Sequence, residues 1–171
     1  MSDQDQDTVC VEADGLALEI GVAPAAAALD ARLAAVIASA LTAANQAAGP
    51  AQGAVTVVVD DDARIRALNR LWRGFDKPTN VLSFPSPATQ PGPARTIGDI
   101  AISYETAARE AAAEDKSFAD HVAHLSVHGF LHLLGHGHDS DDAAEAMERL
   151  ERAILARIGI SDPYVAHEAE G

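Results

Sequence analysis

The pattern of hydrophobic and polar residues predicts a chain that mixes strands with helices. Apolar residues alternate with polar or small ones over residues 8–22, which is typical of one or two short strands. Over residues 25–48 the apolar positions recur at helical spacing, which predicts one amphipathic helix. Residues 54–59 are β-branched and almost continuously apolar, as in a strand covered on both faces.

A second helix is expected directly after this strand, because three consecutive aspartates, residues 60–62, offer N-caps. Its apolar residues should point inward and its arginines outward; the inward set is Ile65, Leu68, Leu71 and Trp72, and the outward set is Arg64, Arg66 and Arg70. Two further strands are predicted at 80–84 and 96–103, joined by a loop rich in proline and glycine.

The third part of the chain is predicted to be helical. A short helix covers residues 104–115, and Ser117 to Asp120 resemble a capping box that begins the next helix. That next helix is apolar nearly all round, which marks it as the buried central helix. Asp139 to Asp142 should cap a last helix. The fold class is therefore α+β, with a small central mixed sheet of about four strands packed with about five helices.

Length and charge limit the domain organisation and the partners. The 171 residues suit a single domain, expected at 8–160 between an acidic disordered N-terminus (1–7) and a C-terminal tail (161–171). A formal charge of −14 argues against broad attraction to nucleic acid, so any RNA contact must be local. A single cysteine, Cys10, excludes an internal disulfide and a cysteine-based zinc ribbon. With neither a secretory signal nor an apolar run long enough for a bilayer, we expect a cytoplasmic protein without membrane contact.

Histidines near the end of the central helix form a candidate metal site. His128 and His132 are four residues apart, so their imidazoles stand on one helix face and can share an ion. Gly135 can adopt the left-handed conformation that ends a helix and returns His138 to the same point. Three nitrogen ligands with an open fourth position are typical of a catalytic zinc site. The sequence therefore predicts one zinc ion at the end of this helix. The spacing matches the metzincin proteases, but Gly129 stands where they need a glutamate base.

Other histidines leave alternatives open. His124 lies one turn before His128, so His124, His128 and His132 form a rival ligand set. His136 could compete with His138 for the ion. His121, in contrast, is expected to be a hydrogen-bonded core residue.

A basic cluster forms a second candidate site in this acidic chain. Arg64, Arg66 and Arg70 fit a solvated helix face, whereas Arg73 and Lys77 fall in a turn-rich stretch, where functional side chains are commonly mounted. An arginine fork suits a phosphate group. Arg73 and Lys77 are therefore the candidate RNA-binding residues.

Three separated blocks together resemble one known family. They are Trp72-Arg73-Gly74-Phe75-Asp76-Lys77-Pro78-Thr79-Asn80-Val81-Leu82-Ser83-Phe84-Pro85, Gly98-Asp99-Ile100-Ala101-Ile102-Ser103, and the His-Gly-x-Leu-His-Leu-x-Gly-x-x-His run from residue 128 to residue 138. In content and order they resemble the YbeY family of bacterial endoribonucleases and rRNA maturation factors. The family usually has tyrosine and aspartate where this chain has His136 and Gly137, and Asp139 is the candidate substitute for that aspartate.

The resemblance implies a zinc-dependent endoribonuclease specific for single-stranded RNA, acting in 16S rRNA 3′-end maturation and 70S ribosome quality control. By position it implies His128, His132 and His138 as zinc ligands, with another divalent metal possible, and Arg73 as the catalytic basic residue. It also implies ribosomal RNA, small-subunit proteins and an assembly GTPase as partners.

Two other functional classes stay open at this point. One is a metal-dependent hydrolase of another substrate, such as a peptide, and the absence of a glutamate base at Gly129 is the feature against it. The other is a non-catalytic ribosome-assembly factor with a structural metal. Within the nuclease reading, no residue stands out as general base, so water and the ribose 2′-hydroxyl are both candidate nucleophiles.

Overall fold

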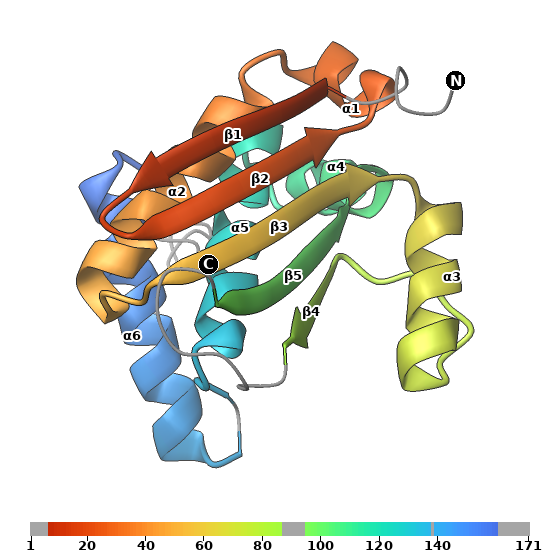
Figure 1. Ribbon diagram of the computed structural model, residues 1–171. Helices are drawn as coiled ribbons and strands as arrows, with labels where there is room; N and C mark the ends of the chain where they lie inside the picture. Colours follow the sequence, from red (N-terminus) through yellow and green to blue (C-terminus); the bar gives the residue numbers. More distant parts are fainter. Residues whose placement is uncertain (1–6, 87–94, 138, 161–171) are drawn as a thin grey trace.

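The computed structural model describes residues 7–86, 95–137 and 139–160, so the predicted tails lie almost entirely outside the described residues. Within these ranges the strands form one five-stranded sheet in the order β1-β2-β3-β5-β4 (Figure 1). The strands are β1 (Asp7–Ala13), β2 (Leu16–Val22), β3 (Gly53–Asp60), β4 (Val81–Pro85) and β5 (Thr96–Ser103). The two outer pairs are antiparallel, whereas β3 runs parallel to β2 and to β5. The sheet is therefore mixed, as predicted, and residues 8–22 supply both of the short strands allowed for.

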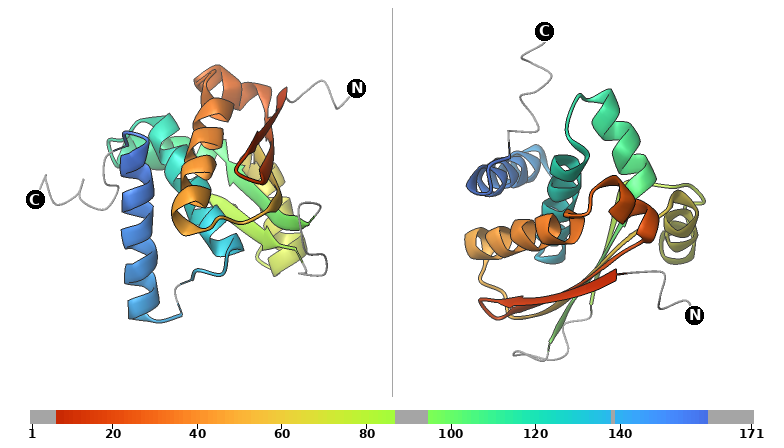
Figure 2. Two further views of the ribbon diagram at one scale, coloured as in Figure 1. Left: turned by 60° about the vertical axis from the view of Figure 1, so that its left-hand side comes forward. Right: turned by 90° about the horizontal axis from the view of Figure 1, so that it is seen from above.

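Helices cover mainly one face of this sheet. They are α1 (Pro24–Leu29), α2 (Leu33–Ala48), α3 (Asp62–Arg73), α4 (Tyr104–Ala113), α5 (Phe118–Leu133) and α6 (Asp141–Arg157). Helices α2 and α5 lie against the sheet, and α6 packs on their far side, which makes it the outermost layer (Figure 2). The α+β class predicted from the sequence is confirmed. None of the helices in the described ranges is both long enough and apolar enough to span a membrane.

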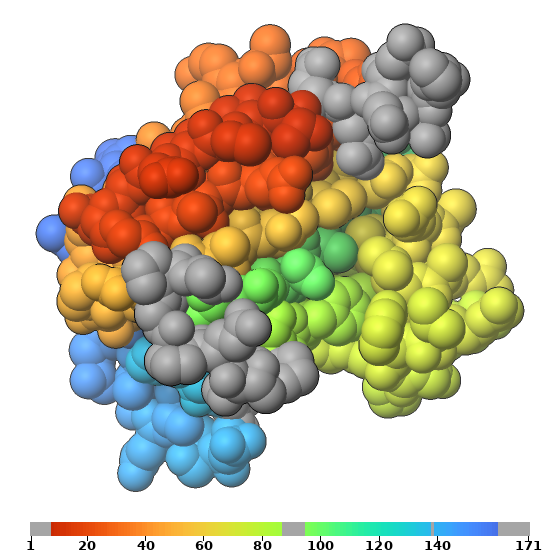
Figure 3. Space-filling view, viewed as in Figure 1, coloured from red at the N-terminus to blue at the C-terminus, as the bar shows by residue number. Residues whose placement is uncertain are grey.

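The strand β3 differs from its prediction. Val55, Val57 and Val59 are buried beneath the helices, but the alternate residues on the other face are only partly covered. Strands β1, β2 and β3 form the molecular surface there (Figure 3). The expectation of a strand covered on both faces was wrong because α3 shields only the β4–β5 end of that face.

The helix predicted over residues 25–48 is in fact two helices, α1 and α2. Asp30 leaves the helical conformation, with φ −157° and ψ 112°. Its side chain accepts a hydrogen bond from the backbone N–H of Arg32 at 2.9 Å. A short acidic side chain that binds the backbone locally competes with the helix, and this breaks the predicted element.

Helix α3 begins as predicted, because the Asp61 side chain accepts a hydrogen bond from the backbone N–H of Arg64. Ile65 and Leu68 pack against β4 and β5. The prediction that Leu71 and Trp72 point inward was wrong, since they are 73% and 67% exposed. Strand β4 is short and lies at the edge of the sheet, so Trp72 meets it only through a tilted contact with Phe84, with ring centroids 6.1 Å apart.

Candidate active site

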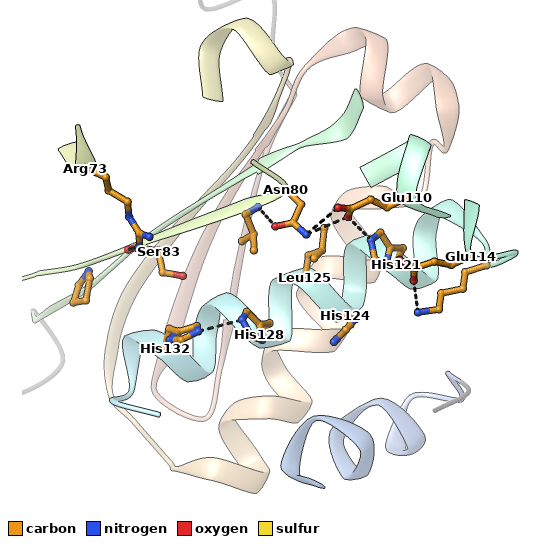
Figure 4. A pocket seen from close by; sticks show the side chains of 13 residues that line it. Arg73, Asn80, Ser83, Glu110, Glu114, His121, His124, Leu125, His128 and His132 are labelled. Carbon is orange, nitrogen blue, oxygen red and sulfur yellow. Dashed lines mark hydrogen bonds and ion pairs between the residues drawn. The ribbon is translucent and has the colours of Figure 1, made fainter. Parts of the chain in front are cut away.

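A cleft of about 790 Å³ opens between α5, α4 and the edge strand β4 (Figure 4). Four histidines of α5 stand along one wall, and Arg73 stands on the opposite side. The lining residues are Arg73, Asn80, Val81, Ser83, Pro85, Glu110, Glu114, Lys116, His121, His124, Leu125, His128 and His132. The structure thus places three of the five residues selected from the sequence, Arg73, His128 and His132, around one cavity.

His128 and His132 form a close pair in the last turns of α5. Their Nε2 atoms lie 3.1 Å apart. Two nitrogen ligands of a tetrahedral zinc ion, each about 2.0–2.1 Å from the metal, are separated by roughly 3.3–3.4 Å. The pair therefore already has nearly the spacing that zinc requires, and two imidazoles are donors that zinc prefers.

The third predicted ligand, His138, lies outside the described residues. Within the described ranges, no three His, Cys, Asp or Glu side chains converge on one point. The chain does turn where the sequence predicted, because Gly135 has φ +100° just beyond the end of α5. Residues 128 and 132 therefore fit a metal site as a pair, and a third ligand from the segment after Gly135 would complete it.

A buried carboxylate contacts His128 on the ring nitrogen that faces away from His132. Glu151 of α6 places Oε2 2.7 Å from Nδ1 of His128 and Oε1 2.9 Å from Nε2 of His124. Nε2 of His124 is therefore engaged with a carboxylate and does not face His132. This geometry argues against the rival ligand set that includes His124.

Arg73 reaches the cleft through strand β4. Its Nη2 donates a hydrogen bond to the carbonyl oxygen of Ser83 at 3.4 Å, and Ser83 Oγ donates one to the carbonyl oxygen of Gly129 at 3.0 Å. Gly129 directly follows His128, so two hydrogen bonds connect the arginine to the helix of the histidines. Lys77 is not among the lining residues of the described chain; its ammonium group lies over the ring of Phe75, 5.7 Å from the centroid.

Gly129, which replaces the glutamate of the zincin motif, faces the sheet. A Cβ atom there would lie 3.0 Å from Ser83 Oγ, 3.1 Å from Ile100 Cγ2 and 3.3 Å from Val81 Cγ2. A larger side chain would have to separate α5 from β4 and β5. Position 129 therefore points into the core, where a glutamate side chain would have no room without such a shift.

Arg73 was predicted in a turn-rich stretch but is the last residue of α3, and only Lys77 lies on the turn that follows, which is tied back to this helix. Asp76 receives a hydrogen bond from Arg66 Nε at 2.8 Å, and this bond lowers the pKa of the Asp76 carboxyl. Both side chains are about half exposed, so the pair adds little stability. The solvated helix face predicted for Arg66 is confirmed, with this contact in addition.

The other end of the cleft is polar and was not foreseen. His121 is buried, as predicted, and its Nε2 lies 2.9 Å from Oε1 of Glu110, which also accepts a hydrogen bond from Asn80 Nδ2 at 3.1 Å. Glu110 carries no local motif that would single it out, and Asn80 was noted only as part of the first of the three blocks, without a role of its own. Glu151 had a signal, because it interrupts the apolar stripe of α6 between Met147 and Ile154.

Fold and cleft together define an α+β protein whose central helix presents a row of histidines to a cavity that an arginine also lines. The sequence profile of the family described as "Endoribonuclease YbeY" matches residues 23–159. The chain belongs to this family.

Curated relatives agree with this assignment. A protein from Chelativorans sp. named "Endoribonuclease YbeY" is 57% identical over 118 residues, which cover 68% of this chain and 72% of the relative. A protein of the same name from Nitrobacter winogradskyi is 56% identical over 119 residues, covering 67% of this chain and 63% of the relative. One from Bradyrhizobium diazoefficiens is 59% identical over 121 residues, which cover 67% of this chain and 65% of the relative.

A solved structure has the same fold. The solution structure of TM1509 from Thermotoga maritima superposes with a TM-score of 0.51, covering 75% of this chain and 85% of that one. The two sequences are 22% identical, so this likeness concerns the fold alone.

Proposed function

We propose that this protein is a zinc-dependent endoribonuclease that cleaves single-stranded RNA, acting in 16S rRNA 3′-end maturation and 70S ribosome quality control. Membership of the YbeY family and the names of the curated relatives support an RNA-cleaving hydrolase. The observation that carries the proposal is the placement of the His128–His132 pair and Arg73 around one cleft.

His128, His132 and His138 would hold the metal ion, with zinc favoured by an all-imidazole donor set and another divalent metal possible. Bound there, zinc would polarise a phosphate oxygen and lower the pKa of a water molecule toward about 7.

Arg73 would bind the scissile phosphate and neutralise the charge that develops on its oxygens. A guanidinium group donates several hydrogen bonds in a fixed plane, which matches phosphate geometry. Its hydrogen bond to the Ser83 carbonyl aims the group along β4 into the cleft. Lys77, on the turn beyond α3, would contact RNA outside the cleft.

Either water or the ribose 2′-hydroxyl would attack the phosphorus. The two routes leave different ends, because only attack by the 2′-hydroxyl produces a 2′,3′-cyclic phosphate. Identification of the cleaved ends by mass spectrometry therefore decides between them.

The cellular part of the proposal is a cytoplasmic protein that works at the ribosome. Ribosomal RNA, small-subunit proteins and an assembly GTPase would be its partners. The net charge of −14 supports protein contacts and a local rather than extended RNA contact.

The first prediction separates metal binding from RNA cleavage. Arg73→Ala should retain zinc and lose roughly 10²–10³-fold in cleavage rate, the usual cost of removing one donor that stabilises developing negative charge. His132→Ala should lose both zinc and cleavage. Zinc content by mass spectrometry and cleavage of a short unpaired RNA measure the two properties.

Arg64→Ala is the matched control, because it removes the same charge from an exposed position of the same helix. It should leave both properties unchanged. Full cleavage by Arg73→Ala would remove this residue from the mechanism. Zinc-loaded wild type that binds the RNA without cleaving it would favour the ribosome-assembly alternative.

A further inference from the structure

Glu151 is a fully buried carboxylate in contact with a candidate metal ligand. It belongs to α6, the outermost helix, and is 0% exposed. Its neighbours along the buried stripe of α6 are apolar: Met147, Ile154 and Leu155. Burying a carboxylate costs free energy unless strong hydrogen bonds compensate, and an apolar residue would pack at this position without that cost.

The two carboxylate oxygens contact two different histidines of α5. Oε2 lies 2.7 Å from Nδ1 of His128, and Oε1 lies 2.9 Å from Nε2 of His124. A protonated carboxyl group could donate only one hydrogen bond, so at least one imidazole must be the donor. The ionised carboxylate, which only accepts, satisfies both contacts when both rings donate.

The direction of the hydrogen bond between His128 and Glu151 determines which nitrogen of His128 is available. When Nδ1–H donates to Glu151, the neutral imidazole carries its lone pair on Nε2. Nε2 of His128 is also the atom that lies 3.1 Å from Nε2 of His132. A carboxylate behind a ligating imidazole fixes its orientation and tautomer and raises its basicity.

His124 has a related role in this arrangement. By engaging Oε1, it fixes the carboxylate from the second side, so that Oε2 stays directed at His128. The three residues thus form a chain from His124 through Glu151 to His128.

We propose that Glu151 is a positioning residue for the metal site: its buried carboxylate holds His128 in the Nδ1–H tautomer, with Nε2 directed at His132 and available to a metal ion. This inference rests on the proposed function, because it assumes that His128 and His132 bind metal.

The test compares zinc affinities, measured by competition with a chromophoric chelator, across a series of variants. Glu151→Met keeps the volume and apolar packing but removes both acceptor oxygens, and should weaken zinc binding roughly 10–100-fold. Glu151→Gln keeps one acceptor and should give a smaller loss. Glu145→Met makes the same change at an exposed position of α6 and should leave affinity unchanged.

A spectroscopic measurement separates positioning from general stabilisation. Imidazole ¹⁵N shifts of the wild type before zinc is added should show His128 as the Nδ1–H tautomer, and this preference should weaken in Glu151→Met. The measurement on the wild type decides the matter even if Glu151→Met does not fold.

Two results would overturn the inference alone: a folded Glu151→Met variant with zinc affinity within about twofold of wild type, or a wild-type His128 protonated at Nε2. In both cases the wild type would still bind zinc and His132→Ala would still lose it. Wild type that binds no zinc, by contrast, would overturn the proposed function and this inference together.

Discussion

Asp62 shows how one side chain positions a helix that carries a site residue. Its carboxylate accepts hydrogen bonds from Ser103 Oγ, from Thr106 Oγ1 at 2.6 Å and from Arg109 Nη2 at 2.9 Å. These donors come from the end of β5 and from α4, so they fix the first turn of α3, whose last residue is Arg73. Burial acts to raise the pKa of Asp62, but the hydrogen bonds outweigh it and lower the pKa below 3.8.

The second prediction follows from the sign of this shift. A carboxylate whose pKa is lower in the folded state contributes stability above its ordinary pKa, and this contribution is lost as pH falls through the folded value. Asp62→Asn should therefore lower the free energy of unfolding by about 1–2 kcal/mol at pH 7, because asparagine loses the negative charge and keeps only one acceptor oxygen for the three donors. The difference from wild type should shrink as the pH falls below 3.8.

Urea unfolding at several pH values measures this difference. Asp142→Asn is the control, since it removes the same charge from an exposed position in the first turn of α6. A difference between wild type and Asp62→Asn that stays constant from pH 7 to below 3.8 would show that the ionised carboxylate is not what stabilises the fold.

At the scale of elements, local signals predicted where helices begin. Ser117 and Asp61 accept hydrogen bonds from backbone N–H groups three residues later, and both caps were recognisable in the sequence. The buried side of α3 was only partly predictable. Ile65 and Leu68 pack on the sheet as predicted, but the exposure of Leu71 and Trp72 depends on where the sheet ends. The break between α1 and α2 was missed because an aspartate such as Asp30 can either continue a helix or bind a nearby backbone N–H, and here it binds that of Arg32.

The site was predictable to a different extent in its two halves. His128 and His132 are one helical turn apart, so their proximity follows from local geometry. Arg73 reaches the same cleft only because β4 pairs with β5 and presents Ser83 to it. Glu151 approaches His128 from another helix, and no local pattern encodes such a contact.

The third prediction tests how α3 is attached. Ile65→Ala should lower the free energy of unfolding by about 2–5 kcal/mol, because Ile65 is 0% exposed and its truncation leaves a cavity. Leu71→Gln, six residues later in the same helix, should stay within about 0.5 kcal/mol of wild type. Equilibrium unfolding in urea measures both variants. A loss of several kcal/mol in Leu71→Gln would mean that the last turn of α3 is covered in solution.

At the scale of the whole molecule, charge determines how RNA can bind. The chain has 26 acidic and 12 basic residues, so RNA meets a repulsive surface except near its few exposed cations. Arg73 is a cation of the cleft, whereas Arg66 is paired with Asp76. Binding should therefore depend on one or two phosphate contacts rather than on an extended basic surface.

The fourth prediction is a shallow salt dependence of RNA affinity. Each phosphate contact to single-stranded RNA contributes a slope of about −0.7 in log K against log salt, so one or two contacts predict roughly −0.7 to −1.4. Fluorescence anisotropy with a short unpaired RNA, in a His132→Ala background that prevents cleavage, measures this slope. Adding Arg73→Ala should make it shallower by about 0.7.

Arg64→Ala in the same background is the control and should leave the slope unchanged. A slope steeper than about −3 would reveal phosphate contacts at other parts of the surface.

The close fit of Gly129 against Ser83 limits which substitutions the cleft can accept. The same few atoms join the wall with the imidazoles to the wall with the guanidinium, since Ser83 bonds both Gly129 and Arg73. Any substitution that widens the contact between Gly129 and Ser83 shifts the histidines relative to Arg73. Substitutions at this contact therefore alter the metal-binding and phosphate-binding residues together. We expect natural sequence variation to concentrate at the rim of the cavity and to spare the residues where α5 contacts β4.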